Sequence, residues 1–198
     1  AASAAEARTR LRDDPVDLNS LLRDVMEMCR LNPSLRKDVV QVIDLQATRS
    51  IPGNRDKLKQ AILNIVINAY QAMNDQSEVK EPKIVIKTID REHAVVLTIR
   101  DHGCGMDEVG LRRMFEPFHT TKPLGSGTGL GLSIVSSLVT EELGGTIEIG
   151  PRHQAWGGGA EADEPGTRAV VVVEVPDLGA PSGDDPTQEL PVMHLGGG

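Results

Sequence analysis

Residues 57–73 read KLKQAILNIVINAYQAM, and the predicted fold is built around this stretch. At about 100° per residue on a helix, one narrow stripe is polar and nearly all of the remaining circumference is apolar. Such a helix is mostly buried, and an unpaired buried amide costs about 1–3 kcal/mol, so the amides of the stripe must find partners. The stripe consists of Lys57, Gln60, Asn64, Asn68 and Gln71.

Two amides of the stripe, Asn64 and Asn68, lie one helical turn apart. Their side-chain oxygens predict a Mg²⁺ site that is completed by phosphate oxygens, because hard cations prefer oxygen ligands. The alternative is that the stripe faces solvent. Asn is a poor helix former, and a solvated stripe more often holds Glu, Lys or Arg, which favours a lined pocket.

The flanking sequence predicts further helices and strands. A helix is expected over 18–29, a strand over 38–45, a turn at Pro52-Gly53 and the central helix over 55–74. The β-branched segments 83–89 and 94–100 form a hairpin, and a short helix is expected over 108–114. A helix over 130–143 ends at Gly144-Gly145, and strands follow at 146–149 and 168–175. This order predicts an α/β fold, a two-layer α/β sandwich with a mixed sheet and helices on one face.

The chain divides into one domain and two flanking segments. Residues 1–14 are expected to be the end of a longer helix that belongs to a dimerisation or phosphoacceptor region, because Asp14-Pro15 breaks the helical pattern. Residues 15–176 form the predicted domain. Residues 177–198 are rich in Gly, Pro and Asp and are expected to be a disordered tail.

The hairpin's second strand is followed by Asp101-His102-Gly103-Cys104-Gly105-Met106. A carboxylate at a strand end can accept a hydrogen bond from an exocyclic amine such as that of adenine. The glycines at 103 and 105 would let the backbone approach a flat base and turn sharply. The alternative is an ordinary Asp-Gly turn.

A glycine-rich segment, residues 125–133, leads directly into the next predicted helix. Its exposed N–H groups and the helix N-terminus predict a site for a di- or triphosphate. The segment lacks the Gly-Lys-Ser/Thr of a P-loop and the third glycine of a dinucleotide fingerprint. The alternative is a flexible linker.

Upstream of the glycine-rich segment, residues Phe115–Lys122 predict a lid over the site, in which the phenylalanines dock and Lys122 reaches phosphate. The alternative is an ordinary surface loop.

In this order, the segments resemble the four nucleotide-binding boxes of the GHKL superfamily, to which gyrases and histidine kinases belong. Leu63–Ala69 looks like the N box, Asp101–Met106 the first G box, Phe115–Phe118 the F box and Gly127–Leu132 the second G box. The resemblance implies a Bergerat-type sandwich that holds ATP and Mg²⁺ under a mobile lid.

The resemblance also implies residue roles. Asn64 and Asn68 would bind the metal, and Asn64 and Lys122 would serve catalysis. The cofactor-binding residues would be Asn64, Asn68, Gln71, Asp101, Gly103, Gly105, Met106, Phe118, Thr121, Lys122, Gly127, Thr128, Gly129, Leu130, Gly131, Leu132 and Thr167.

Within the superfamily, Asn64 favours the kinase branch. Hydrolytic members place a Glu there, whereas a neutral amide cannot serve as a general base. Phosphoryl transfer remains available, because it depends mainly on positioning and charge neutralisation. None of the five histidines fits the phosphoacceptor pattern of the resembled sensor histidine kinases. The alternatives are an anti-sigma-type serine kinase and a nucleotide-gated binding module that does not transfer phosphate.

The resembled kinases imply the partners. These are a histidine-bearing helical dimerisation domain of the same protein and a cognate response regulator, with the full-length protein a homodimer. The stretch Asn68–Met73 and the segment Phe118–Lys122 are similar to those of nitrogen-regulator-type sensor kinases.

Charge and composition narrow the function classes. The formal net charge of −8 argues against nucleic acid as a partner. No apolar run approaches the ~20 residues of a membrane span, and no signal peptide opens the sequence. Cys29 and Cys104 have no metal-ligand spacing and suit reduced thiols. We therefore expect a cytoplasmic domain, whether of a soluble protein or of a membrane-bound sensor.

Overall fold

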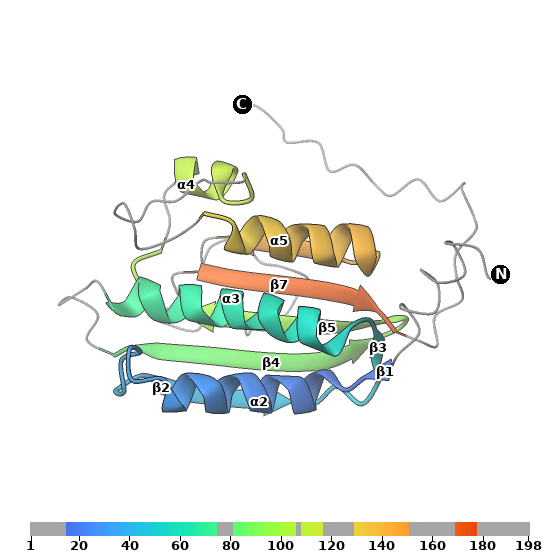
Figure 1. Cartoon of the computed structure of the whole chain (residues 1–198), viewed down its shortest axis with the longest axis horizontal. Helices are drawn as coiled ribbons and strands as arrows, with labels where there is room; N and C mark the ends of the chain where they lie inside the picture. Colours follow the sequence, from blue (N-terminus) through green and yellow to red (C-terminus); the bar gives the residue numbers. More distant parts are fainter. Residues whose placement is uncertain (1–14, 75–80, 106–107, 117–128, 151–168, 178–198) are drawn as a thin grey trace.

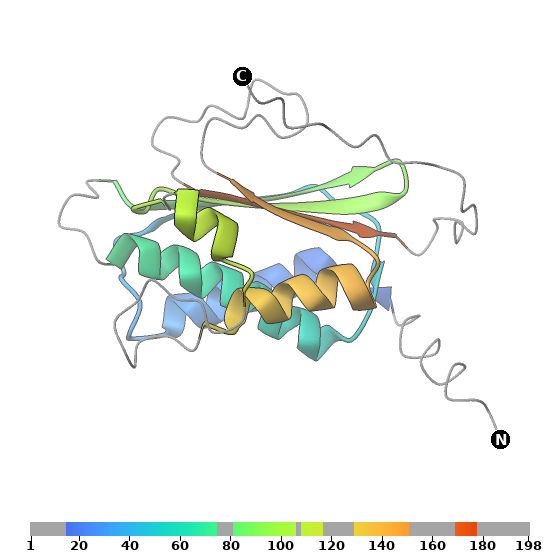
Figure 2. The ribbon, with the colours of Figure 1, turned by 90° about the horizontal axis from the view of Figure 1, so that it is seen from above.

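The computed structural model describes residues 15–74, 81–105, 108–116, 129–150 and 169–177. These residues form a five-stranded sheet with a helical layer on one face (Figures 1 and 2). The strand order is β2-β4-β5-β7-β6. β2 runs parallel to β4, and the other neighbours are antiparallel. The predicted α/β sandwich, with its mixed sheet and its helices on one face, is confirmed.

The elements follow the predicted order with two short additions. They are β1 (Pro15–Val16), α2 (Leu18–Leu31), β2 (Val40–Leu45), β3 (Ile51–Pro52), α3 (Arg55–Asn74), β4 (Lys83–Arg91), β5 (Ala94–Asp101), α4 (Glu108–Arg113), α5 (Gly131–Ser137), the π-helical turn η1 (Leu138–Glu142), β6 (Thr146–Gly150) and β7 (Ala169–Pro176). None of the described helices combines the length and the apolar character that a membrane crossing requires.

Helix α2 begins at a side-chain cap. The Asp17 carboxylate accepts hydrogen bonds from the backbone N–H groups of Asn19, at 2.9 Å, and Ser20, at 3.1 Å. These N–H groups have no partner inside the helix, so the cap stabilises its first turn. The buried face is the one that the apolar periodicity predicted: Leu18, Leu21, Leu22, Val25, Met26 and Cys29. Burying each large aliphatic side chain contributes about 1.5–3 kcal/mol, which holds α2 against α3.

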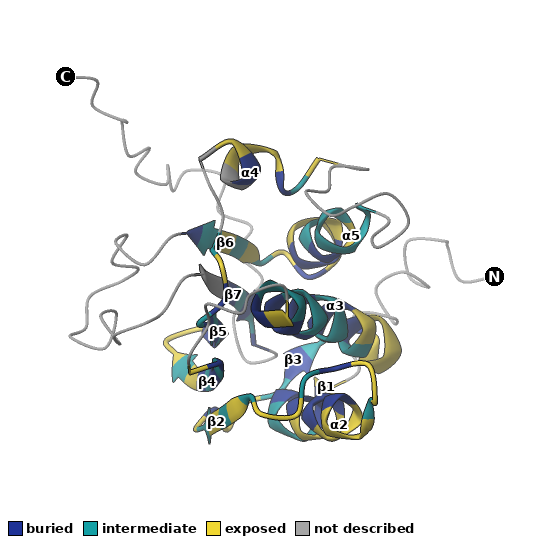
Figure 3. Cartoon of the chain, turned by 90° about the vertical axis from the view of Figure 1, so that its left-hand side faces the viewer, coloured by how far each residue is buried: buried dark blue, intermediate teal, exposed yellow. Residues whose placement is uncertain are grey.

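Helix α3 is the centre of the helical layer, between α2 and α5 (Figure 3). The side-chain oxygen of Asn54 caps it, accepting from the N–H groups of Asp56 and Lys57, both at 3.0 Å. The predicted apolar circumference is buried, with Leu58, Ala61, Ile62, Ile65, Val66, Ala69, Tyr70 and Met73 in the core. Burial on both flanks explains why α3 is apolar around most of its circumference.

The last helix differs from the prediction in its final turn. The sequence predicts one helix over 130–143, whereas α5 changes into the π-helical turn η1 at Leu138. The Leu143 N–H donates to the Leu138 carbonyl at 3.1 Å. The predicted stop is confirmed. Gly144 has a φ of +66°, and a Cβ at Gly145 would overlap the carbonyl oxygen of Glu174 on β7.

Two elements, β1 and β3, were not predicted from the sequence. They form a separate two-stranded ladder in which Val16 pairs with Ile51. Two-residue strands carry no periodicity that could reveal them. The turn expected at Pro52-Gly53 lies at the end of β3, where Gly53 has a φ of +141°.

A polar network holds the loop after β2 to α2 and β4. The hydroxyl of the fully buried Thr88 donates to the Asn19 side-chain oxygen at 2.7 Å and accepts from the Ala47 N–H at 3.3 Å. Nearby, the Asp90 carboxylate accepts from the Thr48 hydroxyl at 2.7 Å. The hydrogen-bonding groups that this junction buries are therefore paired with one another.

Candidate functional site

The polar stripe of α3 divides into two parts. At its first turn the ammonium group of Lys57 pairs with the Glu142 carboxylate of η1 at 2.8 Å, and both side chains are more than half exposed. Gln60 is also exposed. Asn64, Asn68 and Gln71 are only partly exposed. The candidate site is therefore the second half of the stripe, and the first half is a surface ion pair.

The start of α5 lies against this second half. A Cβ built on Gly131 would stand 3.7 Å from Cγ and 3.9 Å from Nδ2 of Asn64. Gly131 thus brings the backbone of the glycine-rich segment into contact distance of the first predicted metal ligand. The preceding Gly129 has a φ of +67°, a left-handed conformation that suits glycine. The Leu130 carbonyl accepts from the N–H of Ile134 at 3.0 Å, which closes the first turn of α5.

The turn after β5 lies at the other end of the half-stripe. Asp101 ends β5 and is only 6% exposed. Its carboxylate accepts a hydrogen bond from the Gly103 N–H at 2.9 Å. Burial raises the pKa of the Asp101 carboxyl from 3.8 to about 6, while the hydrogen bond from Gly103 acts in the opposite direction. At neutral pH the group is still ionised, so a buried acceptor with negative charge lies at the strand end.

This turn is attached directly to α3. The Cys104 N–H donates to the Ala72 carbonyl at 3.0 Å, satisfying one of the carbonyls that the end of a helix leaves without a partner. A Cβ on Gly103 would come within 2.7 Å of the Ala72 backbone, so only glycine fits there. Ala72 lies one turn beyond Asn68. The Asp101 turn and the amides are therefore held at a fixed spacing by one helix.

The structure places Gly131 against Asn64, and it attaches the turn that follows Asp101 to α3 through Gly103 and Cys104. That the described candidates line one shared site stays a prediction; they are Asn64, Asn68, Gln71, Asp101, Gly103, Gly105, Gly129, Leu130, Gly131 and Leu132. Met106, Phe118, Thr121, Lys122, Gly127, Thr128 and Thr167 lie outside the described residues, and their roles stay predictions. The segment predicted as a lid falls outside them too, apart from its first two residues.

Sequence reasoning missed two contributors, Ala72 and the Cys104 N–H. The sequence pattern predicted that Gly103 allows the close approach of a flat base. In the structure, the close contact with Ala72 already requires glycine at position 103. No motif marks Ala72, because its role depends on a backbone carbonyl. The small side chain at that position is the one signal that could have suggested close packing.

The oxygen atoms that the candidate site offers are of the kind that bind Mg²⁺ together with a nucleoside triphosphate. The amides of Asn64 and Asn68 supply neutral oxygens, which a divalent ion combines with phosphate oxygens. Among the described residues, no group of three or more His, Cys, Asp or Glu side chains could hold a metal by itself. A metal at this site therefore needs oxygens from the ligand, as in a metal–nucleotide complex.

Comparison with known proteins identifies the family. Residues 53–178 match the model of the histidine kinase-, DNA gyrase B- and HSP90-like ATPases, which is more than half of the chain. The chain belongs to this family, and the resemblance to the GHKL superfamily is confirmed.

Individual relatives are sensor kinases. The chain is 35% identical over 133 residues to the signal transduction histidine-protein kinase AtoS of Escherichia coli, covering 65% of this chain and 20% of AtoS. It is 33% identical over 156 residues to the two-component sensor PprA of Pseudomonas aeruginosa, covering 77% of this chain and 15% of PprA. The chain thus spans a fifth or less of these two relatives.

Solved structures agree with the fold. The catalytic domain of the histidine kinase ThkA superposes with a TM-score of 0.65 at 26% identity, covering 83% of this chain and 95% of that one. The mycobacterial sensor histidine kinase MprB gives a TM-score of 0.66 at 22% identity, with coverage of 83% and 97%. At the level of the domain, the predicted histidine-kinase catalytic fold is confirmed.

Proposed function

We propose that this chain is the ATP-binding catalytic domain of a two-component sensor histidine kinase. It would transfer the γ-phosphoryl group of ATP to a histidine on a helical domain of the same protein. The observation that carries the proposal is the double attachment of α3. Gly131 lies against Asn64 at one end of the half-stripe, and Cys104 is hydrogen-bonded to Ala72 at the other.

The two ends of the half-stripe on α3 would bind opposite ends of ATP, the adenine and the phosphates. The Asp101 carboxylate is an acceptor for the adenine amine, and its burial excludes water that would compete for the hydrogen bond. Asn68 and Asn64 would hold Mg²⁺ beside the phosphates, and the ion, when bound, neutralises charge on the phosphoryl oxygens. Lys122, predicted at the lid, would add a positive charge to the same phosphates.

The residue at position 64 also decides between transfer and hydrolysis. An amide cannot take a proton from water, so water attack on the γ-phosphate gains no general base from Asn64. Transfer to an imidazole needs no such base at this position, because the neutral ring nitrogen is itself the nucleophile. The proposal therefore predicts slow ATP hydrolysis and faster transfer to histidine.

The partners follow from the same proposal. They are a histidine-bearing helical dimerisation domain of the same protein and a cognate response regulator. The whole protein would be a homodimer, either cytoplasmic or membrane-bound with this domain in the cytoplasm. ThkA has been crystallised in complex with the response regulator TrrA, which supports a regulator partner. The similarity to nitrogen-regulator-type kinases remains a prediction.

A reconstituted transfer assay tests the function. The protein is mixed with γ-labelled ATP, Mg²⁺ and a separate histidine-bearing helical domain, and the acid lability of the bound label is measured. We expect acid-labile label on the helical domain, and none with Asn68→Ala. Tight ATP binding without transfer to any member of a panel of such domains would instead support a nucleotide-gated binding module. Acid-stable label on serine would support an anti-sigma-type kinase.

A further inference from the structure

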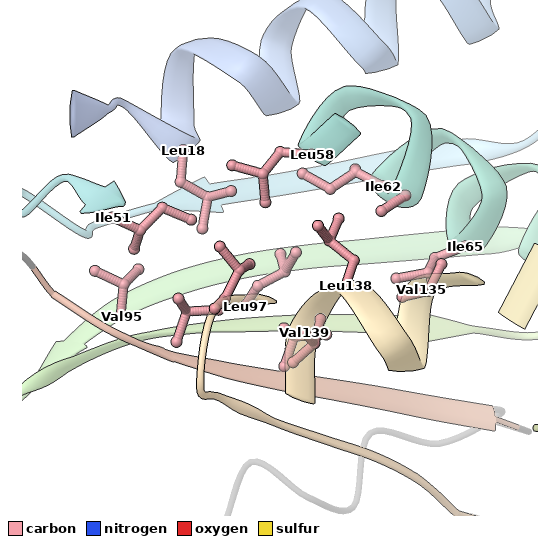
Figure 4. Close-up of a pocket in the computed structure, with 14 residues that line it drawn as sticks. Leu18, Ile51, Leu58, Ile62, Ile65, Val95, Leu97, Val135, Leu138 and Val139 are labelled. Atoms are coloured by element: carbon pink, nitrogen blue, oxygen red, sulfur yellow. The ribbon is translucent and has the colours of Figure 1, made fainter. Parts of the chain in front are cut away.

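A cavity of about 30 Å³ lies between the helical layer and the sheet, apart from the polar half-stripe (Figure 4). Its walls come mainly from α3, the α5–η1 helix and the facing strands. Every lining side chain is aliphatic; those from the helices include Leu58, Ile62, Ile65, Val135, Leu138 and Val139. This cavity is a feature of the core and takes no part in the nucleotide site described above.

The lining determines what the cavity can hold. A buried water requires two to four polar partners, and no lining side chain offers one, so an occupant must be apolar. The volume limits its size. An engineered apolar cavity of about 150 Å³ binds benzene, so one of about 30 Å³ is too small for an aromatic ring. The remaining candidates for an occupant are a single atom and a very short aliphatic molecule. Either would supply dispersion contacts that the cavity walls lack.

The cavity and the nucleotide site share two helices. Ile65, in the cavity wall, directly follows Asn64 in α3. Val135, also in the wall, lies one turn after Gly131 in α5, and Gly131 lies against Asn64. The spacing between α3 and α5 therefore sets both the width of the cavity and the distance between the amide stripe and the glycine-rich segment.

We propose that this cavity is a binding site for one small apolar molecule, and that its occupancy fixes the α3–α5 spacing and strengthens nucleotide binding. The second half of the proposal rests on the proposed function. Filling a void between two helices restricts their relative motion, and a ligand that binds the restricted form then loses less conformational entropy.

Xenon serves as the probe for occupancy. In methyl-labelled protein under xenon pressure, we expect saturable shifts of the methyl signals of Ile62, Val135 and Val139. Val25 is fully buried in α2 but does not line the cavity, so its methyl signals are the internal control. Absent shifts at the lining methyls, or equal shifts at Val25, would overturn the binding site.

A cavity-filling variant and a nucleotide titration complete the test. Ala61 also lines the cavity, and Ala61→Val adds two methyl groups to its side chain, which should abolish saturation by xenon. Val139→Ile is the second variant if the first does not fold. For the wild-type protein, the ATP affinity measured by calorimetry should rise about fivefold under xenon. This is the low end of the range typical for coupling between two binding sites. Unchanged affinity alongside saturable methyl shifts would overturn the coupling. Absence of any ATP binding would contradict the proposed function, while the methyl shifts would still report on the cavity.

Discussion

Replacing Asp101 with Asn should separate the stability of the fold from the binding of nucleotide. Asp101 is buried, ionised at neutral pH and hydrogen-bonded to the Gly103 N–H. Asn keeps an oxygen that can accept this hydrogen bond but carries no charge. We therefore expect Asp101→Asn to be more stable than wild type at pH 7 and to bind ATP less tightly.

The raised pKa sets the size and the sign of the stability effect. The folded protein binds the Asp101 proton more tightly than the unfolded chain does, so the ionised carboxylate destabilises the fold. A rise from 3.8 to about 6 corresponds to about 3 kcal/mol at most, at roughly 1.4 kcal/mol per pH unit. This destabilisation is present above pH 6 and disappears as pH falls towards 3.8. The advantage of Asp101→Asn should shrink in the same pH range.

Asp101→Asn should raise the stability of the fold but lower its affinity for ATP. A hydrogen bond to a charged acceptor contributes about 1.5–3 kcal/mol, so ATP affinity should fall at least about tenfold in Asp101→Asn. In wild type, ATP affinity should also fall as pH decreases through about 6, because protonation removes the negative charge of the acceptor.

Urea unfolding followed by circular dichroism between pH 7 and pH 4, with calorimetric ATP titration, measures both effects. Asp90→Asn is the matched control. The hydrogen bond from Thr48 is the largest cause that lowers the pKa of the Asp90 carboxyl, so its ionised form stabilises the fold and its replacement should destabilise at pH 7 without changing ATP affinity. A variant Asp101→Asn that is less stable than wild type at pH 7, or that binds ATP normally, would refute the reasoning.

Three further substitutions test the site and its supports. Asn68→Ala should abolish Mg²⁺-dependent ATP binding and leave the circular dichroism spectrum unchanged; calorimetry with and without Mg²⁺ distinguishes this from a general loss of binding. Gly103→Ala should destabilise the fold by about 1–3 kcal/mol in urea unfolding, because its methyl group would overlap Ala72; wild-type stability would show that the turn can move away from α3. Thr88→Val should cost about 1–3 kcal/mol, because it leaves the Asn19 side-chain oxygen and the Ala47 N–H without the Thr88 hydroxyl; a neutral effect on the urea midpoint would contradict this account of the network.

The sequence was informative wherever a pattern repeats or a cap is explicit. The apolar circumference of α3 and the glycines after η1 predicted a buried helix and a helix stop, and both are confirmed. The ladder between β1 and β3 was missed, because two residues cannot show an alternation. The π-helical turn was missed too, because the i→i+5 hydrogen bond from the Leu143 N–H to the Leu138 carbonyl has no side-chain pattern of its own.

Within the candidate site, residue types were easier to predict than contacts. Asn64, Asn68 and Asp101 could be proposed as site residues, because amides in a buried helix and a carboxylate at a strand end require polar partners. The attachment through Ala72 could not be predicted, because it uses a backbone carbonyl that every residue carries. The ion pair at the first turn of the stripe could not be predicted either, because the partner of Lys57, Glu142, lies 85 residues away in the sequence.

The most direct test is whether α3 and the Asp101 turn contact the same ligand. In ¹⁵N-labelled protein titrated with Mg²⁺ and a non-hydrolysable ATP analogue, the side-chain amides of Asn64 and Asn68 and the backbone amide of Gly103 should shift together with one dissociation constant. Shifts at Gly103 alone, or at the two Asn side chains alone, would contradict a single nucleotide site built on α3.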